Sequence, residues 1–234
     1  MLRSQKISNL IRKLGLMPLA NYLINVRYFA HKKLSRFLGG SHYHKIYNDT
    51  FYDNQNQNEV LGSTPDLVAN YLIGSFQPAS VIDFGCGTGI YLQALARHDI
   101  EVMGIDASPA AVKNFRLRPD QIIIKDLTQP LLLGKKYDCA LCFEVAEHIP
   151  HEYSENLIAN LCRVSDLIIF SAAAKGQGGI GHINEQAPEF WRPLFEQHGF
   201  ACLEAETMRL KNYLKANHAV FWLANNILIF KKPA

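Results

Sequence analysis

Residues 81–89 read VIDFGCGTG, and this stretch decides the fold. A short apolar run ends at Phe84, glycines follow at alternate positions (Gly85, Gly87 and Gly89), and a helical pattern begins directly after them. Glycine lets the backbone turn tightly and approach a ligand closely, next to the amide groups of a helix N-terminus. The stretch therefore predicts a strand, a ligand-binding turn and a helix. A plain strand–helix turn would leave the repeated glycines unexplained.

On either side of this stretch, short apolar runs alternate with helical patterns. A helix is expected to start at Ser63 or Thr64, before Pro65. The strand-like runs are residues 81–84, 102–105, 122–124, 140–143 and 167–170, and the later helical patterns are 90–97, 109–117, 153–163 and 188–198. This alternation predicts a parallel sheet with helices on both faces. Two closing strands are expected at 201–206 and 221–230.

Acidic residues mark the ends of the first strands. Asp83 lies in the first strand, Asp106 ends the second 23 residues later, and Asp126 follows the third. Ligands of open α/β sheets bind outside the carboxyl ends of the strands, so the three carboxylates should converge on one crevice. Each alone could be a turn residue or a helix cap. A nicotinamide dinucleotide is an alternative ligand, but its fingerprint expects glycine or alanine where Ile90 stands.

The motif DFGCGTG, with the acids that follow it, resembles the first motifs of class I S-adenosylmethionine-dependent methyltransferases over about residues 61–234. The resemblance implies a Rossmann-like fold, with a seven-stranded, mostly parallel sheet and an antiparallel last strand. It also implies the cofactor and the residues that hold it. The implied cofactor-binding residues are Asp83, Gly85, Gly87 and Gly89 for the methionine part, Asp106 for the ribose hydroxyls, Asp126 and Leu127 beside the adenine, and Glu144 near the cofactor.

Residues 144–149 read EVAEHI, which resembles a segment frequent among small-molecule O-methyltransferases. If a helix starts at the end of the fourth strand, Glu144, Glu147 and His148 share one face. His182, in a glycine-rich segment after the fifth strand, could reach them across the crevice. Similar segments bind metal in quinone-pathway and small-RNA O-methyltransferases. Two alternatives stay open, a divalent metal held by these four residues, or metal-free catalysis with His182 or His148 as the base.

Residues 1–60 differ from the rest of the chain. Residues 1–50 hold nine Lys/Arg and a single acid, Asp49, a charge of +8, whereas the remaining 15 basic and 20 acidic residues give −5. Two amphipathic helical patterns over 1–38 precede a polar connector. We expect an arm that acts as a lid or contacts a membrane surface, ahead of a methyltransferase domain at 61–234. The acidic domain argues against nucleic acid as partner.

The cysteines indicate a reducing compartment. Five cysteines form no disulfide framework, and Cys139 and Cys142 lie in one predicted strand, facing opposite sides, so they cannot bind one metal. We expect a cytoplasmic protein, peripheral at the inner face of a membrane if the arm binds lipid. Neither a signal peptide nor a membrane span is expected, because the longest charge-free stretch near the start, residues 14–26, is too short.

The motifs specify the cofactor and are nearly silent on the acceptor. The basic start and residues 176–191 resemble methyltransferases of surface-polysaccharide and glycolipid biosynthesis. A sugar hydroxyl of a glycan or glycolipid precursor is therefore the leading acceptor. Another small or lipid-like molecule, such as a quinone precursor, is the alternative. Two further hypotheses are less favoured by the sequence: methylation of an RNA 2′-hydroxyl, and a cofactor-binding subunit without catalytic activity.

Overall fold

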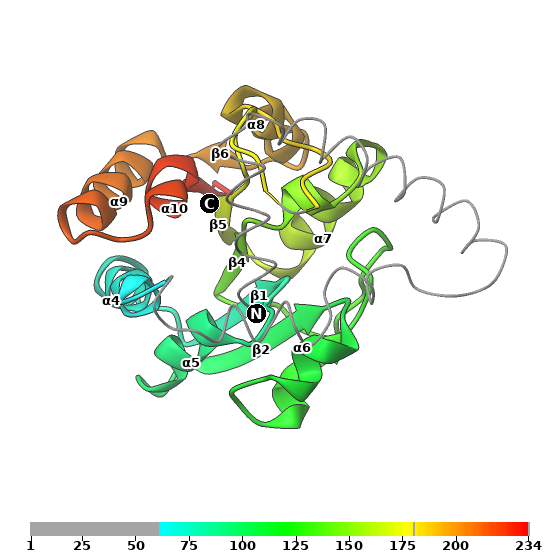
Figure 1. Cartoon of the computed structure of the whole chain (residues 1–234), viewed down its shortest axis with the longest axis vertical. Helices are drawn as coiled ribbons and strands as arrows, with labels where there is room; N and C mark the ends of the chain where they lie inside the picture. Colours follow the sequence, from blue (N-terminus) through cyan, green and yellow to red (C-terminus); the bar gives the residue numbers. More distant parts are fainter. Residues whose placement is uncertain (1–60, 180, 234) are drawn as a thin grey trace, which may run out of the picture.

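The computed structural model describes residues 61–179 and 181–233. The predictions made for the arm and connector, residues 1–60, lie outside this part. The described chain forms one seven-stranded sheet in the order β3-β2-β1-β4-β5-β7-β6, with helices on both faces (Figure 1). The predicted fold class is confirmed.

The first five strands are parallel and lie where the apolar runs predict them. They are β1 (Ser80–Phe84), β2 (Glu101–Asp106), β3 (Ile122–Ile124), β4 (Cys139–Phe143) and β5 (Leu167–Ser171). β1 pairs with β2 on one side and with β4 on the other, so the strand order reverses beside β1. A reversal of this kind opens a crevice at the carboxyl ends of the strands, where ligands bind in open α/β sheets.

The end of the chain differs from the prediction. Only Ala201–Cys202 (β6) of the expected strand 201–206 is a strand, and α9 (Glu204–Ala216) begins two residues later. Of the expected strand 221–230, the first part is a helix, α10 (Phe221–Asn226), and only Leu228–Lys231 (β7) joins the sheet. Helix α9 starts with two acidic residues in its first turn, which suit the positive end of a helix. The antiparallel last strand is confirmed, because β7 is antiparallel to both β5 and β6.

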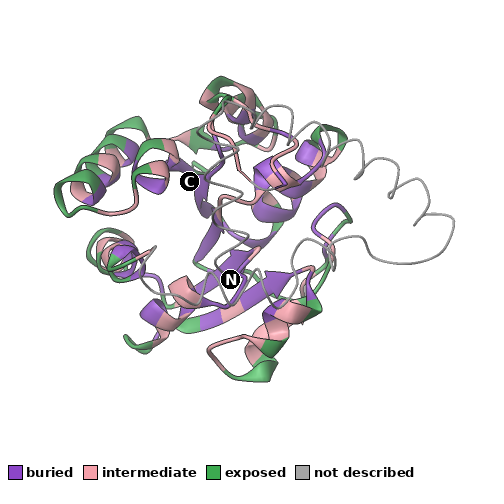
Figure 2. Cartoon of the chain, in the orientation of Figure 1, coloured by how far each residue is buried: buried purple, intermediate pink, exposed green. Residues whose placement is uncertain are grey.

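Buried residues lie along the strands and on the helices that pack against them (Figure 2). They form two hydrophobic clusters, one on each face of the sheet. One face packs against α7 (Ser154–Val164) and α8 (Pro188–Gln197), and the other against α4 (Thr64–Phe76), α5 (Ile90–Ala96), α9 and α10. The short helix α6 (Pro109–Lys113) and the 3-10 turns η2 (Pro119–Gln121), η3 (Ala146–His148) and η4 (His151–Tyr153) complete the described elements.

The two clusters confirm the prediction made for Cys139 and Cys142. Cys142 packs in the cluster with α7 and α8, and Cys139 in the cluster on the opposite face, so the two thiols are core residues that cannot share a ligand. Trp191 is buried, with its ring 5.3 Å from that of Phe170. Within residues 61–179 and 181–233, no helix is long and apolar enough to cross a membrane.

Candidate active site

The glycine turn is built as the sequence predicts. Gly85, Gly87 and Gly89 all have positive φ angles, of 74°, 53° and 75°, which residues with a side chain rarely adopt. A Cβ on Gly85 would also collide with Val145, and one on Gly89 with the ring of Phe115. Positions 85 and 89 therefore have no room for a side chain, and the three glycines let the backbone turn tightly at the start of α5.

Asp106 holds this turn in place. Its Oδ2 accepts a hydrogen bond from the Gly87 amide at 2.9 Å, and its Oδ1 accepts one from the Ser108 amide at 2.8 Å. Asp126 plays a local part, because its Oδ1 accepts from the amide and the hydroxyl of Thr128 at 2.9 and 2.8 Å. The neighbouring Leu127 is buried in the core. The ribose and adenine contacts expected of these residues remain predictions.

Asp83 lies buried in β1, within electrostatic reach of the buried Asp106 carboxylate. Burial, and then the charge of Asp106, raise the pKa of Asp83 to about 8. A carboxylate in such a place is poised to pair with a cationic group of a ligand, because ionising it without a partner is costly.

We expect Asp83→Asn to stabilise the ligand-free protein at neutral pH. The pKa of Asp83 in the folded state, about 8, lies above its value of about 3.9 in an unfolded chain, so the folded state retains a proton that the unfolded state releases. Stability that this group contributes is complete below pH 4 and is lost as the pH rises through 8. The free energy of unfolding of the variant should gain at most about 1.4 kcal/mol per pH unit over that of the unmodified protein between these values, which corresponds to roughly 3–6 °C in melting temperature.

Thermal melts of the two proteins at pH 5, 6, 7 and 8 measure this difference. Asp166→Asn is the control, because Asp166 is an exposed partner of Lys136. Equal melting temperatures for the Asp83 variant and the unmodified protein across this range would contradict the assignment.

Glu144, Glu147 and His148 do not lie on one helix face, so that premise was wrong. Glu144 has a φ of 53° and precedes the three-residue turn η3, which contains the other two. The Glu144 carboxylate accepts hydrogen bonds from Gln177 Nε2 at 3.1 Å and Asn226 Nδ2 at 3.2 Å. Neither partner was predicted. Asn226 in particular lies in a segment expected to be a strand.

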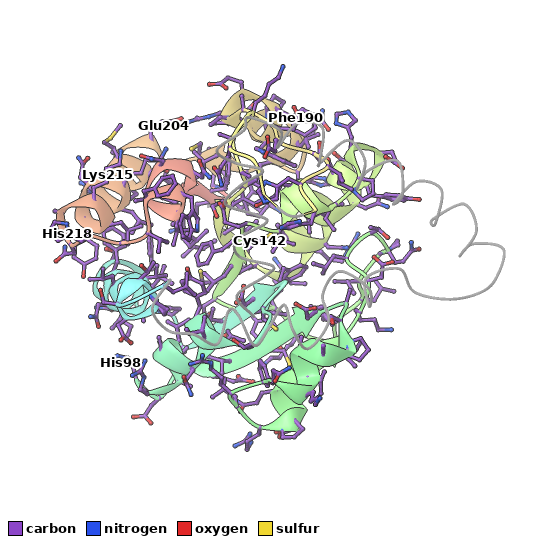
Figure 3. All side chains as sticks on the ribbon, in the orientation of Figure 1. His98, Cys142, Phe190, Glu204, Lys215 and His218 are labelled. Carbon is purple, nitrogen blue, oxygen red and sulfur yellow. The ribbon has the colours of Figure 1, made fainter. Side chains whose placement is uncertain are left out.

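The structure does bring Glu147, His148 and His182 together. One ligand atom from each lies within 4.8 Å of the others, and Glu144 is not part of this group. His182 Nε2 is 3.9 Å from Glu147 Oε1, and the two imidazole rings meet edge to face with centroids 4.9 Å apart. Two further histidines, His98 and His218, lie at the periphery of the molecule (Figure 3).

Hydrogen bonds orient both rings. His148 Nδ1 lies 3.1 Å from the carbonyl oxygen of Gly181, which can only accept, so Nδ1 carries the hydrogen. His182 Nδ1 lies 2.8 Å from Glu185 Oε1. Burial, and then the neighbouring His182, lower the pKa of His148 to about 3, although the Gly181 carbonyl opposes this. An imidazole with so low a pKa is a poor general base at neutral pH.

Glu147 is the unusual member of the group. Its side chain is fully buried, and neither carboxylate oxygen has a hydrogen-bond partner among the described residues. Burial, and then the charge of Glu144, raise its pKa well above the ordinary value, although the nearby amides of Glu147 and Ala173 oppose the rise. A buried carboxylate without partners is costly, and a bound cation would remove that cost.

The donor set suits a divalent transition metal. One carboxylate and two imidazoles are ligands that such ions prefer over magnesium. A small side-chain movement would bring the donor atoms to the roughly 3–4 Å that separates ligands of one ion. A Cβ on Gly179 would collide with the ring of His182, so only glycine at this position leaves room for the imidazole. The residues therefore fit a metal ion.

Comparisons with known proteins identify the family of the chain. Residues 52–171, just over half of the chain, match the methyltransferase domain family. The chain is 26% identical to a ubiquinone biosynthesis O-methyltransferase of Alkalilimnicola ehrlichii over 132 residues, which cover 52% of this chain and 53% of the relative. It is 32% identical to a magnesium-protoporphyrin O-methyltransferase of Synechocystis over 124 residues, 49% of this chain and 54% of the relative.

The chain thus spans about half the length of the curated relatives that it matches. Among solved structures, the magnesium protoporphyrin IX methyltransferase of Synechocystis with bound SAH aligns with a TM-score of 0.54 at 22% identity, covering 73% of this chain and 83% of that one. This likeness confirms the fold. By its glycine turn, its strand order and its match to the family, the chain belongs to the methyltransferase domain family, within the class I S-adenosylmethionine-dependent methyltransferases.

Proposed function

We propose that the protein transfers the methyl group of S-adenosylmethionine to a hydroxyl oxygen of a small organic acceptor, with a divalent metal bound by Glu147, His148 and His182. The observation that carries this proposal is the fully buried Glu147 carboxylate, which faces two oriented histidines and has no hydrogen-bond partner among the described residues. The names of the matched relatives, which are O-methyltransferases, support oxygen as the accepting atom.

Different residues would bind the cofactor and the acceptor. The glycine turn and Asp83 would hold the methionine part of the cofactor, and Asp106 the ribose, while keeping the amides of Gly87 and Ser108 in place. Methyl transfer from a sulfonium is an in-line displacement, so positioning contributes most of the catalysis. When bound, the metal lowers the pKa of the acceptor hydroxyl and orients it. The low pKa of His148 supports a role as ligand over a role as base.

The acceptor is proposed to be a hydroxyl on a ring of the quinone-precursor type, because the ubiquinone-pathway relatives match the chain. A sugar hydroxyl of a glycan or glycolipid precursor is the second candidate, and the resemblance of residues 176–191 to polysaccharide-pathway methyltransferases favours it. Both classes offer neighbouring hydroxyl groups to a metal ion.

A panel of catechols, phenols, sugars and RNA ends, assayed by release of S-adenosylhomocysteine, tests the proposal. Each acceptor is assayed with the protein as purified, after exhaustive chelation, and after return of Mn²⁺, Co²⁺, Zn²⁺ or Mg²⁺. We expect chelation to lower turnover at least about 100-fold, and a transition metal to restore it. Full turnover without metal would leave His182 or His148 as the base. Cofactor binding without turnover of any acceptor would indicate a non-catalytic subunit.

Residues 1–38 are proposed to contact an anionic membrane surface, and this would place the protein at the inner face of a membrane. Each basic residue near such a surface contributes about 1 kcal/mol. We expect the full chain to co-sediment with vesicles containing anionic lipid, and a variant that begins at Ser41 to stay in the supernatant. Neutral vesicles are the control. Equal sedimentation of the two proteins would leave the arm as a lid on the methyltransferase domain.

A further inference from the structure

The segment between β5 and α8 folds around the side chain of Glu185. One carboxylate oxygen accepts a hydrogen bond from the amide of Gly176 at 2.8 Å, and the other accepts from the amide of Gly178 at 2.6 Å. The second oxygen also lies 2.8 Å from Nδ1 of His182. A single carboxylate thus binds both the backbone of the glycine-rich segment and one histidine of the candidate metal site.

The ring of His182 is enclosed by its neighbours. Its side chain is 10% exposed and that of Glu185 is 17% exposed. The backbone of Gly179 lies so close that a Cβ there would collide with three atoms of the ring. The ring of His148 meets it edge to face. This enclosure alone would still allow more than one orientation of the ring. The hydrogen bond with Glu185 selects one of them.

The contact with Glu185 also selects the tautomer. A carboxylate only accepts hydrogen bonds, so Nδ1 of His182 carries the hydrogen and Nε2 keeps its lone pair. Nε2 is the nitrogen that faces Glu147, at 3.9 Å. Carboxylates that bind the second nitrogen of a metal-ligating histidine fix its orientation and raise its basicity.

We propose that Glu185 is a positioning residue, which fixes the Nδ1–H tautomer of His182 and presents Nε2 to a divalent transition metal beside Glu147. This inference rests on the proposed function, because it gives the metal site a second set of contacts. It also links the site to the glycine-rich segment, since loss of the carboxylate would release Gly176 and Gly178 together with the histidine.

The alternative is that Glu185 only fastens the segment. Gln177 offers a matched control, because it fastens the same segment without a described contact to His182. Its Nε2 donates to Glu144, and its Oε1 accepts from Asn226 Nδ2 at 2.8 Å. A purely structural role predicts equal effects of changes at the two positions. A positioning role predicts that only the change at Glu185 alters His182.

The experiment compares the full chain with its Glu185→Gln and Gln177→Ala variants by two readouts that need no acceptor. Imidazole ¹⁵N chemical shifts of the metal-free proteins report the tautomer of His182, and titration with Co²⁺, followed by visible absorption, reports metal affinity. We expect Glu185→Gln to lose the pure Nδ1–H tautomer and to bind Co²⁺ about 10–100-fold more weakly. Gln177→Ala should keep the tautomer and bind Co²⁺ within about threefold of the unmodified protein, since its described contacts do not include His182. Binding of S-adenosylhomocysteine and the melting temperature confirm that each variant folds.

An unchanged tautomer together with unchanged Co²⁺ affinity in Glu185→Gln would overturn the proposal. Equal losses in both variants would also overturn it, in favour of simple fastening. Failure of the unmodified protein to bind Co²⁺ would reject the metal in the proposed function, and the tautomer of His182 in the two variants would still decide the role of Glu185.

Discussion

Glu147→Gln is expected to lower the rate of methyl transfer by about 10²–10⁴-fold, the range typical of activating an acceptor for loss of its proton, because the variant would lose the metal proposed to do this. The amide keeps the shape of the side chain but cannot offer the charge that a bound cation needs. The same change should not reduce the melting temperature, because it removes a buried carboxylate whose oxygens have no hydrogen-bond partner among the described residues. A loss of activity without a loss of stability distinguishes a functional residue from a structural one.

The measurement is release of S-adenosylhomocysteine with the best acceptor of the panel, together with the metal content of the purified variant. Glu189→Gln is the matched control, since Glu189 is exposed near the start of α8. Activity within threefold of the unmodified protein, in a variant that holds no metal, would remove Glu147 from the mechanism.

Asp106→Ala is expected to weaken binding of S-adenosylmethionine by at least ten-fold and towards 100-fold. A charge-assisted hydrogen bond contributes roughly 1.5–3 kcal/mol, and the ribose diol would lose such a contact. The structure adds a second cause, because the same carboxylate accepts hydrogen bonds from the amides of Gly87 and Ser108. Without it, the turn proposed to hold the methionine part loses the hydrogen bonds that keep it in place.

Isothermal titration with S-adenosylmethionine and S-adenosylhomocysteine measures this effect. Asp120→Ala serves as the control, because Asp120 is exposed and binds only Arg118 among its described partners. The affinity of Asp106→Asn for the cofactor should lie between those of Asp106→Ala and Asp120→Ala. The carbonyl oxygen of the asparagine can still accept a hydrogen bond from one of the two amides. An affinity within twofold of the unmodified protein in Asp106→Ala would contradict the placement of the ribose.

Local sequence patterns were sufficient to predict the strands and the glycine turn of the first half of the domain. Strands β1 to β5 and the first turn are predicted from residues that are adjacent in the chain. A buried strand requires a run of apolar residues, and a positive φ favours glycine at that position. The chain end was harder. The short apolar run of α10 predicts a strand as readily as a helix, and in the structure the helix buries only Leu223 and Ala224. Periodicity cannot separate short helices from buried strands.

The sequence predicts the candidate metal site only in part. Its residue types and their motif pointed to Glu147, His148 and His182, but also to Glu144, on the premise of a helix that does not form. Backbone geometry at Glu144, with its positive φ, turns its carboxylate toward Gln177 and Asn226 instead. That partnership joins residues 33 and 82 positions apart, and no local pattern encodes it.

The sequence by itself therefore determined the family, the parallel sheet and the cofactor turn, because each depends on residues that are adjacent in the chain. Only the tertiary structure decided which acidic groups meet which histidines. His182 reaches Glu147 across 35 positions of sequence, and Glu185 then selects its tautomer, because the segment between β5 and α8 folds back onto the end of β4. Contacts of this kind depend on how elements pack, and the same residue types in another packing would form a different site.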